Sequence, residues 1–600
     1  MRITPALPLL PLVLLLSACQ QPQQATSSAS SSTGGHKPLP PQVSTVPPEA
    51  LDDVPPQAPL PSAQLEVKKQ EQSAPAGALR NKDIRIAESA APMVEEPAPD
   101  WTPPPANTEV YDHLKRNSVV SVAQDPISTF SIDVDTGSYS NVRRMLNQGT
   151  LPPADAVRVE ELVNYFPYQY PQPVVATGGK VQPFTFSTEM APAPWNANSH
   201  LLKIGIKATD AATTSLPPAN LVFLVDVSGS MDEPNKLPLL KNALRLLINQ
   251  LRPQDKVSLV TYAGGSRVVL EPTTDREKLR NAIARLQPGG GTAGAAGIEL
   301  AYRMARQGYL DQGINRILLC TDGDFNVGIS DFNQLKQMVE ERRKSGVSLS
   351  TLGFGEGNLN DRLMEQLADA GDGQYAYIDN LNEAQKVLVD EFSASMATVA
   401  KDVKLQLEFN PAQVSEYRLI GFENRALKTE DFDNDRVDAG EIGAGHTVTA
   451  LYEVTLVGQA GRLPTPRYAP AAGKPAASPA TNSNELAFLK VRYKAPGSNS
   501  SQLLTSPVWK QQIKPLTQTS DDFRFAAAVA AFGQQLSEDG KYLGRFGWDD
   551  IIRLGEGARG ADRFGYRAEW LKLARLAKSL SSSKPQARSL PPLYPVPQEG

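Results

Sequence analysis

The sequence predicts a multidomain α/β protein with a doubly wound, Rossmann-like central domain, flanked by β-sandwich strands and by α-helical N- and C-terminal segments. One observation is the apolar run 221–225, which is typical of a strand buried on both faces. Another is the spacing of leucine over residues 237–251, which places these side chains on one face of a helix. Strand and helix patterns then alternate to residue 400, which favours a mostly parallel sheet.

The elements of the central domain follow one another in a regular order. After the first strand and helix, further strands are expected at residues 257–262, 268–270, 316–320, 347–354 and 375–378. Further helices are expected at residues 275–286, 297–307, 332–342, 359–370 and 383–400. Sheets of this kind bind their ligands beyond the carboxyl ends of the central strands.

Alternating apolar residues predict strands on both sides of the central domain. They occur in residues 202–206 before it, and in residues 403–409, 448–456 and 489–493 after it. We expect these strands to form one β-sandwich into which the central domain is inserted. Residues 200–207 should then pair with strands between residues 403 and 493.

The first nineteen residues have the features of a secretory signal peptide. Arg2 precedes an apolar run that is too short to span a membrane, and small residues precede Cys19. Leu-Ser-Ala-Cys resembles a bacterial lipobox, which implies cleavage before Cys19 and attachment of fatty acyl chains such as palmitate to that residue. Gln20, where Asp would retain a lipoprotein in the inner membrane, implies the outer membrane. An ordinary signal peptide with an incidental cysteine is the alternative.

Composition limits the classes of function. The chain has 60 Lys and Arg against 65 Asp and Glu, a net charge of −5, which argues against a dedicated nucleic-acid binder. The two cysteines rule out a disulfide scaffold and a Cys-based zinc site, and Cys320 is expected in the core. Residues 20–105 are rich in Pro, Ser, Gln and Ala, which predicts a disordered tether.

Three loops of the central domain carry oxygen ligands. Asp226, Ser228 and Ser230 follow the first strand directly, Thr292 precedes a helix, and Asp322 follows a later strand. Mg²⁺ prefers oxygen ligands in a compact octahedron and keeps some of its water. Hydroxyl ligands leave positive charge on such an ion, so an incoming carboxylate can complete its shell. The alternative is that each loop is a turn or a helix cap.

These five positions match the metal-ion-dependent adhesion site of von Willebrand factor type A (VWA) domains, and the resemblance covers residues 219–400. It implies that Ser228, Ser230 and Thr292 bind Mg²⁺, or Mn²⁺ or Ca²⁺, through their hydroxyls. It implies that Asp226 and Asp322 act through waters or orient those ligands. The implied partner is a protein with a Glu or Asp side chain that reaches the metal.

Segments outside the central domain resemble bacterial YfbK-like lipoproteins, namely residues 130–144, 520–526 and 565–570. The expected organisation is a lipoprotein signal peptide (1–18), a lipidated tether (19–105), an N-terminal domain (106–180), flanking sandwich strands (181–218), the VWA domain (219–400), the rest of the sandwich (401–500), a helical C-terminal domain (515–582) and a disordered tail (583–600).

Two acidic groups outside the VWA site suggest further cation sites. Asp133 and Asp135 fit a capped strand-to-helix turn better. The acidic run 431–435 begins like a calcium-binding EF-hand loop, but Arg436 stands where that loop needs glycine.

The function expected is that of a lipid-anchored envelope binding protein. The alternative is an accessory VWA subunit of an envelope or ATPase-linked assembly, with the ATPase on a separate chain because the glycines at 289–291 lack the lysine of a P-loop. Catalysis is not expected, because the Ser228 turn is no G-x-S-x-G elbow and no nucleophile-and-base pair is recognisable.

Overall fold

The computed structural model describes residues 107–132, 135–173, 182–210, 216–323, 332–464, 484–498 and 500–583. These residues belong to one compact unit. The signal peptide, Cys19, Gln20, the tether, Asp133 and the tail beyond Ser583 lie outside the described residues. What the sequence suggests about them stays a prediction.

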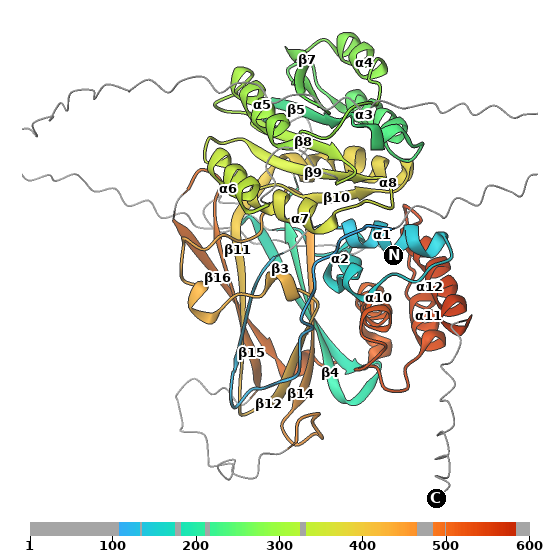
Figure 1. The fold of residues 1–600 in the computed structure, drawn as a ribbon. Coiled ribbons are helices and arrows are strands. Elements are labelled where there is room, and N and C mark those ends of the chain that lie inside the picture. Colours follow the sequence, from blue (N-terminus) through green and yellow to red (C-terminus); the bar gives the residue numbers. More distant parts are fainter. Residues whose placement is uncertain are drawn as a thin grey trace, which may run out of the picture. The chain divides into compact units, whose positions relative to one another are not determined.

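The central domain contains a six-stranded sheet in the order β10-β9-β8-β5-β6-β7 (Figure 1). Its strands are β5 (Ala219–Asp226), β6 (Lys256–Tyr262), β7 (Ser266–Thr273), β8 (Ile314–Thr321), β9 (Ser348–Phe354) and β10 (Tyr375–Ile378). All neighbours are parallel except β7, which runs antiparallel to β6. The mostly parallel sheet expected from the sequence is therefore confirmed.

Helices cover both faces of this sheet (Figure 1). They are α3 (Leu237–Gln250), α4 (Arg276–Ala284), α5 (Gly294–Gln307), α6 (Phe332–Arg343), α7 (Asp361–Ala370), α8 (Leu381–Gln385) and α9 (Phe392–Met396). Side chains of β5 alternate between two cores: Phe223 packs in the core that contains α3 and α4, and Leu224 packs in the core that contains α5 and α6. This alternation explains why the whole strand is apolar.

The single helix expected over residues 383–400 is wrong. The chain forms α8, then a π-helical turn η4 (Lys386–Asp390), then α9, and it is already a strand at Thr398. The strand is β11 (Thr398–Phe409), whose backbone pairs with two neighbouring strands near its start. Pairing across the sheet therefore outweighs the apolar spacing that suggested a longer helix.

Two antiparallel sheets form the β-sandwich. One has the order β1-β12-β14-β4-β3, and the other has the order β13-β11-β15-β16 with β2 also paired to β11. Their remaining strands are β1 (Val120–Ser121), β2 (Ile127–Ser131), β3 (Phe184–Ala193), β4 (Asn196–Ala208), β12 (Val414–Ile420), β13 (Ile442–Gly443), β14 (Thr447–Leu456), β15 (Glu485–Lys494) and β16 (Ser501–Trp509). A core of apolar side chains from both sheets lies between them.

The pairing expected across the central domain is confirmed. Strand β4, which precedes the domain, pairs with β14, which follows it, from Lys207 opposite Thr447 to His200 opposite Val454. The central domain is thus inserted between two strands of the sandwich. Strands β1 and β2 also join the sandwich, although they come from the segment 106–180.

The helices at the two ends of the folded chain pack together. They are α1 (Gly137–Asn147), α2 (Val159–Asn164), α10 (Asp521–Ser537), α11 (Trp548–Glu556) and α12 (Tyr566–Ser583). Short 3₁₀ turns are η1 (Ala154–Ala156), η3 (Gly229–Asp232), η5 (Glu423–Arg425), η6 (Thr429–Asp431), η7 (Lys510–Gln512) and η8 (Leu516–Gln518). Tyr139, Phe525 and the fully buried Trp570 belong to one apolar core. We call the five helices together with this core the helical body.

Candidate metal centre

The candidate site begins where β5 ends. Strands β5 and β8 are parallel neighbours with Val225 opposite Cys320, so Asp226 and Asp322 come to the same edge of the sheet. The hydroxyl of Thr321 donates to Asp226 Oδ2 at 2.8 Å, which ties the two strand ends together. The strand-end geometry expected from the sequence is therefore present.

Asp226 is fully buried, and its carboxylate accepts hydrogen bonds from its neighbours. Besides Thr321, the backbone N–H of Ser228 donates to Asp226 Oδ1 at 2.8 Å. Burial raises the pKa of Asp226 to about 6, opposed by the hydrogen bonds from Ser228 and Thr321 and reinforced by the nearby Asp322. A cation beside this carboxylate would relieve the cost of its burial.

The two serines of the motif face one another. Ser228 Oγ and Ser230 Oγ lie 3.1 Å apart at the start of η3. Ser228 is buried and Ser230 is half-buried, while Gly229 between them is exposed. Two converging hydroxyls at the mouth of the site suit a hard divalent cation, and the exposed glycine leaves an approach from solvent.

The glycine-rich loop that carries Thr292 is hydrogen-bonded to the first loop. Gly289 N–H donates to Val227 O at 2.8 Å, and Gly229 N–H donates to Gly290 O at 3.0 Å. Gly290 has φ +93°, and a Cβ there would meet the backbone N of Gly264 at 3.1 Å, so glycine is required at this position. These contacts bring the buried Thr292 to the edge that holds the serines.

Asp322 has two neighbours that the sequence reasoning missed. Lys236 Nζ lies 3.2 Å from Asp322 Oδ2, and Asn358 Nδ2 donates to the same oxygen at 2.9 Å. Lys236 also donates to Asn358 Oδ1 at 3.0 Å. Asn358 follows β9, so the rule that ligands gather at strand ends could have found it. Lys236 precedes α3 and carries no local signal for this role.

The donor set fits a divalent cation held largely by hydroxyls. Within the described part of the chain, no group of three or more His, Cys, Asp or Glu side chains gathers to hold a metal. A cation at this edge would be held by Ser228, Ser230 and Thr292, with Asp226 and Asp322 oriented by their hydrogen bonds. Asp135, by contrast, accepts from the Tyr375 backbone at 2.9 Å and pairs with Arg425, so it has structural contacts.

Known proteins resemble the chain over most of its length. Family models match residues 221–324 (von Willebrand factor type A domain), 105–203 (von Willebrand factor) and 394–580 (uncharacterized protein YfbK, C-terminal). The uncharacterized protein YfbK of Escherichia coli is 50% identical over 480 residues, which are 79% of this chain and 82% of that protein. The chain belongs to the YfbK family.

Two further proteins are similar to smaller parts of this chain. The uncharacterized protein sll0103 of Synechocystis is 30% identical over 37% of this chain and 51% of that protein. A solved von Willebrand factor type A structure from Catenulispora acidiphila is 17% identical, with a TM-score of 0.37, over 64% of this chain and 88% of that one. The VWA assignment of this YfbK-family chain rests on the family models and on its sheet.

The start of the folded unit pairs with a loop of the candidate site. Thr108 N–H donates to Gly357 O at 2.7 Å, and Val110 N–H donates to Leu359 O at 2.9 Å. Gly357 N–H in turn donates to Glu109 Oε1 at 2.9 Å. These bonds flank Asn358, whose side chain contacts Asp322. In this YfbK-family chain the first described residues therefore help to position a residue of the candidate centre.

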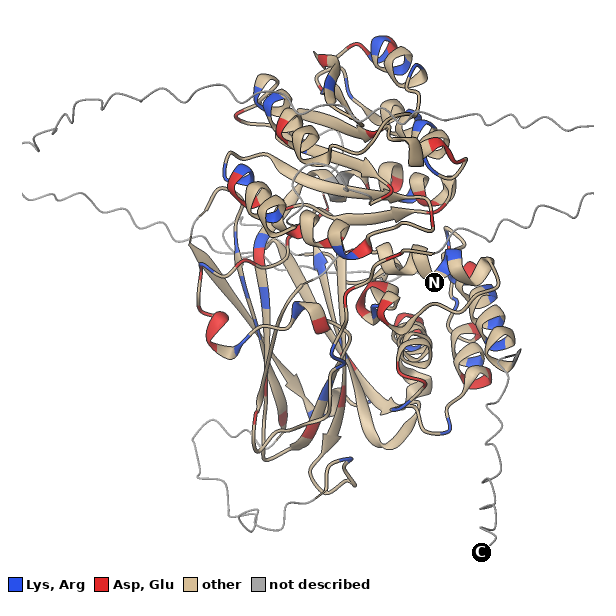
Figure 2. Ribbon diagram, in the orientation of Figure 1, with Lys and Arg blue, Asp and Glu red and all other residues tan. Residues whose placement is uncertain are grey.

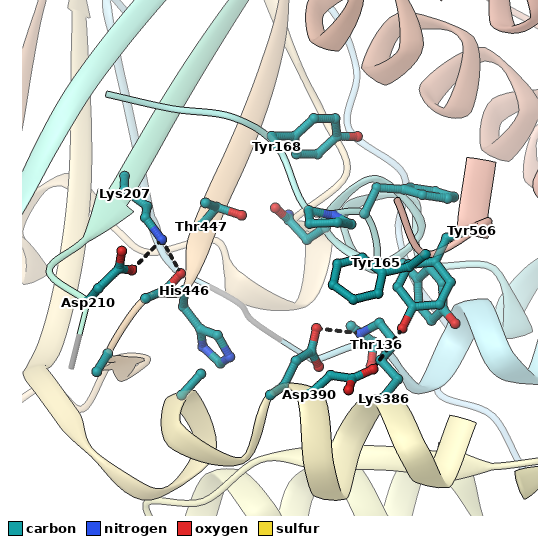
Figure 3. Close-up of a pocket in the computed structure, with 18 residues that line it drawn as sticks. Thr136, Tyr165, Tyr168, Lys207, Asp210, Lys386, Asp390, His446, Thr447 and Tyr566 are labelled. Atoms are coloured by element: carbon teal, nitrogen blue, oxygen red, sulfur yellow. Dashed lines mark hydrogen bonds and ion pairs between the residues drawn. The ribbon is translucent and has the colours of Figure 1, made fainter. Parts of the chain in front are cut away.

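A separate cavity of about 350 Å³ lies where the VWA domain, the sandwich and the helical body meet (Figure 3). Its cations are neutralised within the protein: Lys207 pairs with Asp210 at 2.8 Å, and Lys386 pairs with Glu391 at 2.7 Å. Burial, together with Lys386, Lys207 and Arg316, lowers the pKa of His446 to about 4, so its imidazole is neutral at pH 7.

Acidic and basic residues are interspersed along the helices and strands of the described chain (Figure 2). Within these residues, no helix is both long enough and apolar enough to cross a membrane.

Proposed function

We propose that this protein is a lipid-anchored envelope binding protein whose VWA domain recognises an acidic group of a partner protein through a bound divalent cation. The observation that carries the proposal is the convergence of Ser228 and Ser230 hydroxyls beside the buried Asp226, with Asp322 at the same sheet edge. When bound, Mg²⁺ would supply a Lewis-acidic position that a Glu or Asp carboxylate completes.

Charge supports an acidic partner. The described charged side chains at the centre include two carboxylates, Asp226 and Asp322, and one ammonium, Lys236, which pairs with Asp322. A divalent cation added to that set leaves a net positive charge, and burial of these groups weakens screening by solvent. The half-buried Ser230 and exposed Gly229 leave this charge accessible from outside. The site is proposed to bind rather than to catalyse.

Removal of metal should abolish partner capture. We expect tagged protein, crosslinked in whole cells, to retain an envelope protein in buffer with Mg²⁺ and to lose it in EDTA, because the carboxylate contact needs the cation. Capture is read by mass spectrometry, with Asp226→Ala as the metal-site control. Retention of the same partner in EDTA would contradict metal-dependent recognition, and an ATPase among the partners would favour the accessory-subunit alternative.

Membrane attachment is proposed to depend on Cys19, which follows the lipobox-like Leu-Ser-Ala. We expect Cys19→Ser to move the protein from the membrane to the soluble fraction. Stable attachment to a bilayer takes more than one lipid signal, and the proposed acyl chains are carried by Cys19. Fractionation with immunoblotting measures this, and density-gradient separation tests the outer-membrane location proposed from Gln20. Cys320→Ser is the matched cysteine control, and persistent membrane retention of Cys19→Ser contradicts the anchor.

A further inference from the structure

Lys236 places its side chain inside the candidate metal centre. Its side chain is 3% exposed, and its ammonium contacts both Asp322 Oδ2 and Asn358 Oδ1. Its aliphatic stem lies against Gly355, where an added Cβ would collide with it. Gly355 has φ +79°, a left-handed conformation that suits glycine. The backbone after β9 is therefore shaped to let this lysine reach the centre.

We propose that Lys236 tunes the centre for carboxylate capture: it weakens the binding of the divalent cation itself and strengthens the hold of the loaded site on an acidic ligand. The role rests on the proposed function, because it deepens the electrostatics of that same site. Lys236 acts as a positioning and specificity residue, since it contacts Asp322 and Asn358 in the structure.

The sign of both effects follows from the charges. With Lys236, the two carboxylates and the ammonium sum to −1, and a divalent cation brings the site to +1. Without the lysine charge, the empty site is −2 and the loaded site is neutral. A more negative empty site attracts the cation more strongly, whereas a neutral loaded site has lost its net attraction for a carboxylate.

A purely structural role for Lys236 predicts a different outcome. A buried ion pair that only stabilises the fold would, on removal, lower stability and disorder the centre. Metal binding and carboxylate capture would then weaken together. Opposite changes in the two affinities are the signature of the electrostatic role.

The experiment uses the full chain, with Mg²⁺ alone as one probe and acetate as the carboxylate probe. Mg²⁺ is titrated calorimetrically into wild type and Lys236→Gln, in sodium chloride and in sodium acetate of equal ionic strength. Gln keeps a donor for Asp322 and Asn358 while removing the charge. Lys386→Gln, which removes another buried, ion-paired lysine of the same domain, is the matched control.

Lys236→Gln is expected to bind Mg²⁺ about tenfold more tightly than wild type in chloride, a change of about 1.4 kcal/mol. Acetate should tighten Mg²⁺ binding by wild type and have little effect on Lys236→Gln, because binding of the two ligands is linked reciprocally. Lys386→Gln should behave as wild type. If Lys236→Gln does not fold, Asn358→Asp adds the same unit of negative charge beside the retained lysine and should shift both affinities in the same directions.

Equal or weaker Mg²⁺ binding by folded Lys236→Gln, or an undiminished acetate effect, overturns the role of Lys236 while the metal centre stands. Absence of Mg²⁺ binding by wild type overturns the proposed function, and the role of Lys236 with it.

Discussion

Arg158→Met is expected to lower the free energy of unfolding by about 3–5 kcal/mol, because it leaves buried carboxylates without their cation. Arg158 is 1% exposed and belongs to the helical body, just before α2. Its guanidinium pairs with Glu161, binds Asp361 through both terminal nitrogens at 2.6 and 3.2 Å, and lies 3.5 Å from Glu365. Asp361 and Glu365 belong to α7, so this cluster joins the VWA domain to the helical body.

The pH dependence of that loss has a definite sign. Burial raises the pKa of the Glu365 carboxyl, and Arg158 and Arg425 oppose the rise. Without Arg158 the pKa of Glu365 rises further above its unfolded value, so the folded variant binds more protons than the unfolded chain. Its stability therefore falls as pH rises. Because the pKa of Glu365 is already about 8 with Arg158 present, the cost of the substitution should grow as pH rises above about 8.

Denaturant unfolding followed by circular dichroism measures this difference. Arg553→Met is the matched control, because Arg553 pairs with Asp550 on the exposed face of α11 and such pairs contribute about 0–1 kcal/mol. A loss for Arg158→Met no larger than that of the control would contradict the inter-domain role of the buried cluster.

Asp226→Ala is expected to abolish the stabilisation that Mg²⁺ gives to the wild-type fold. A ligand that binds only the folded state stabilises it by mass action, and the wild-type Tm should rise with Mg²⁺ concentration. Asp226 receives bonds from Ser228 and Thr321, so its loss removes both a charge and the orientation of the serine loop. We expect the affinity for Mg²⁺ to fall by about 100-fold or more. Thermal unfolding with and without Mg²⁺ measures the effect. A Tm rise in Asp226→Ala equal to that in wild type would contradict this prediction.

Strand-end patterns predicted much of the candidate site because parallel strands bring their carboxyl ends to one edge. The shared edge of Asp226 and Asp322 could be predicted because each directly follows a strand of the same parallel sheet. The close approach of the glycine loop before Thr292 to another backbone was found only in the structure. Lys236 was not predictable in this way, since its contact with Asp322 depends on how α3 lies against the loop after β9. Roles of the five expected residues in metal binding stay predictions.

The fold shows the same division between local and long-range information. Alternating residues located the strands of the sandwich, and insertion of the VWA domain between paired strands followed from their positions. The pairing of β2 with β11 could not be predicted, because the short segment 127–131 carries no signal for a partner far along the chain. The helix expected over 383–400 failed for a related reason: strand pairing from Thr398 overrides local apolar spacing.

Calorimetric titration of Mg²⁺ into wild type and Asp226→Ala, side by side, tests the metal centre most directly. Asp311→Ala is the matched control, because Asp311 is exposed and precedes β8, at the opposite edge of the sheet. We expect saturable binding of one Mg²⁺ per chain by wild type and by Asp311→Ala, and no measurable binding by Asp226→Ala. Equal binding by wild type and Asp226→Ala, or none by wild type, would contradict a metal centre at this edge of the VWA sheet.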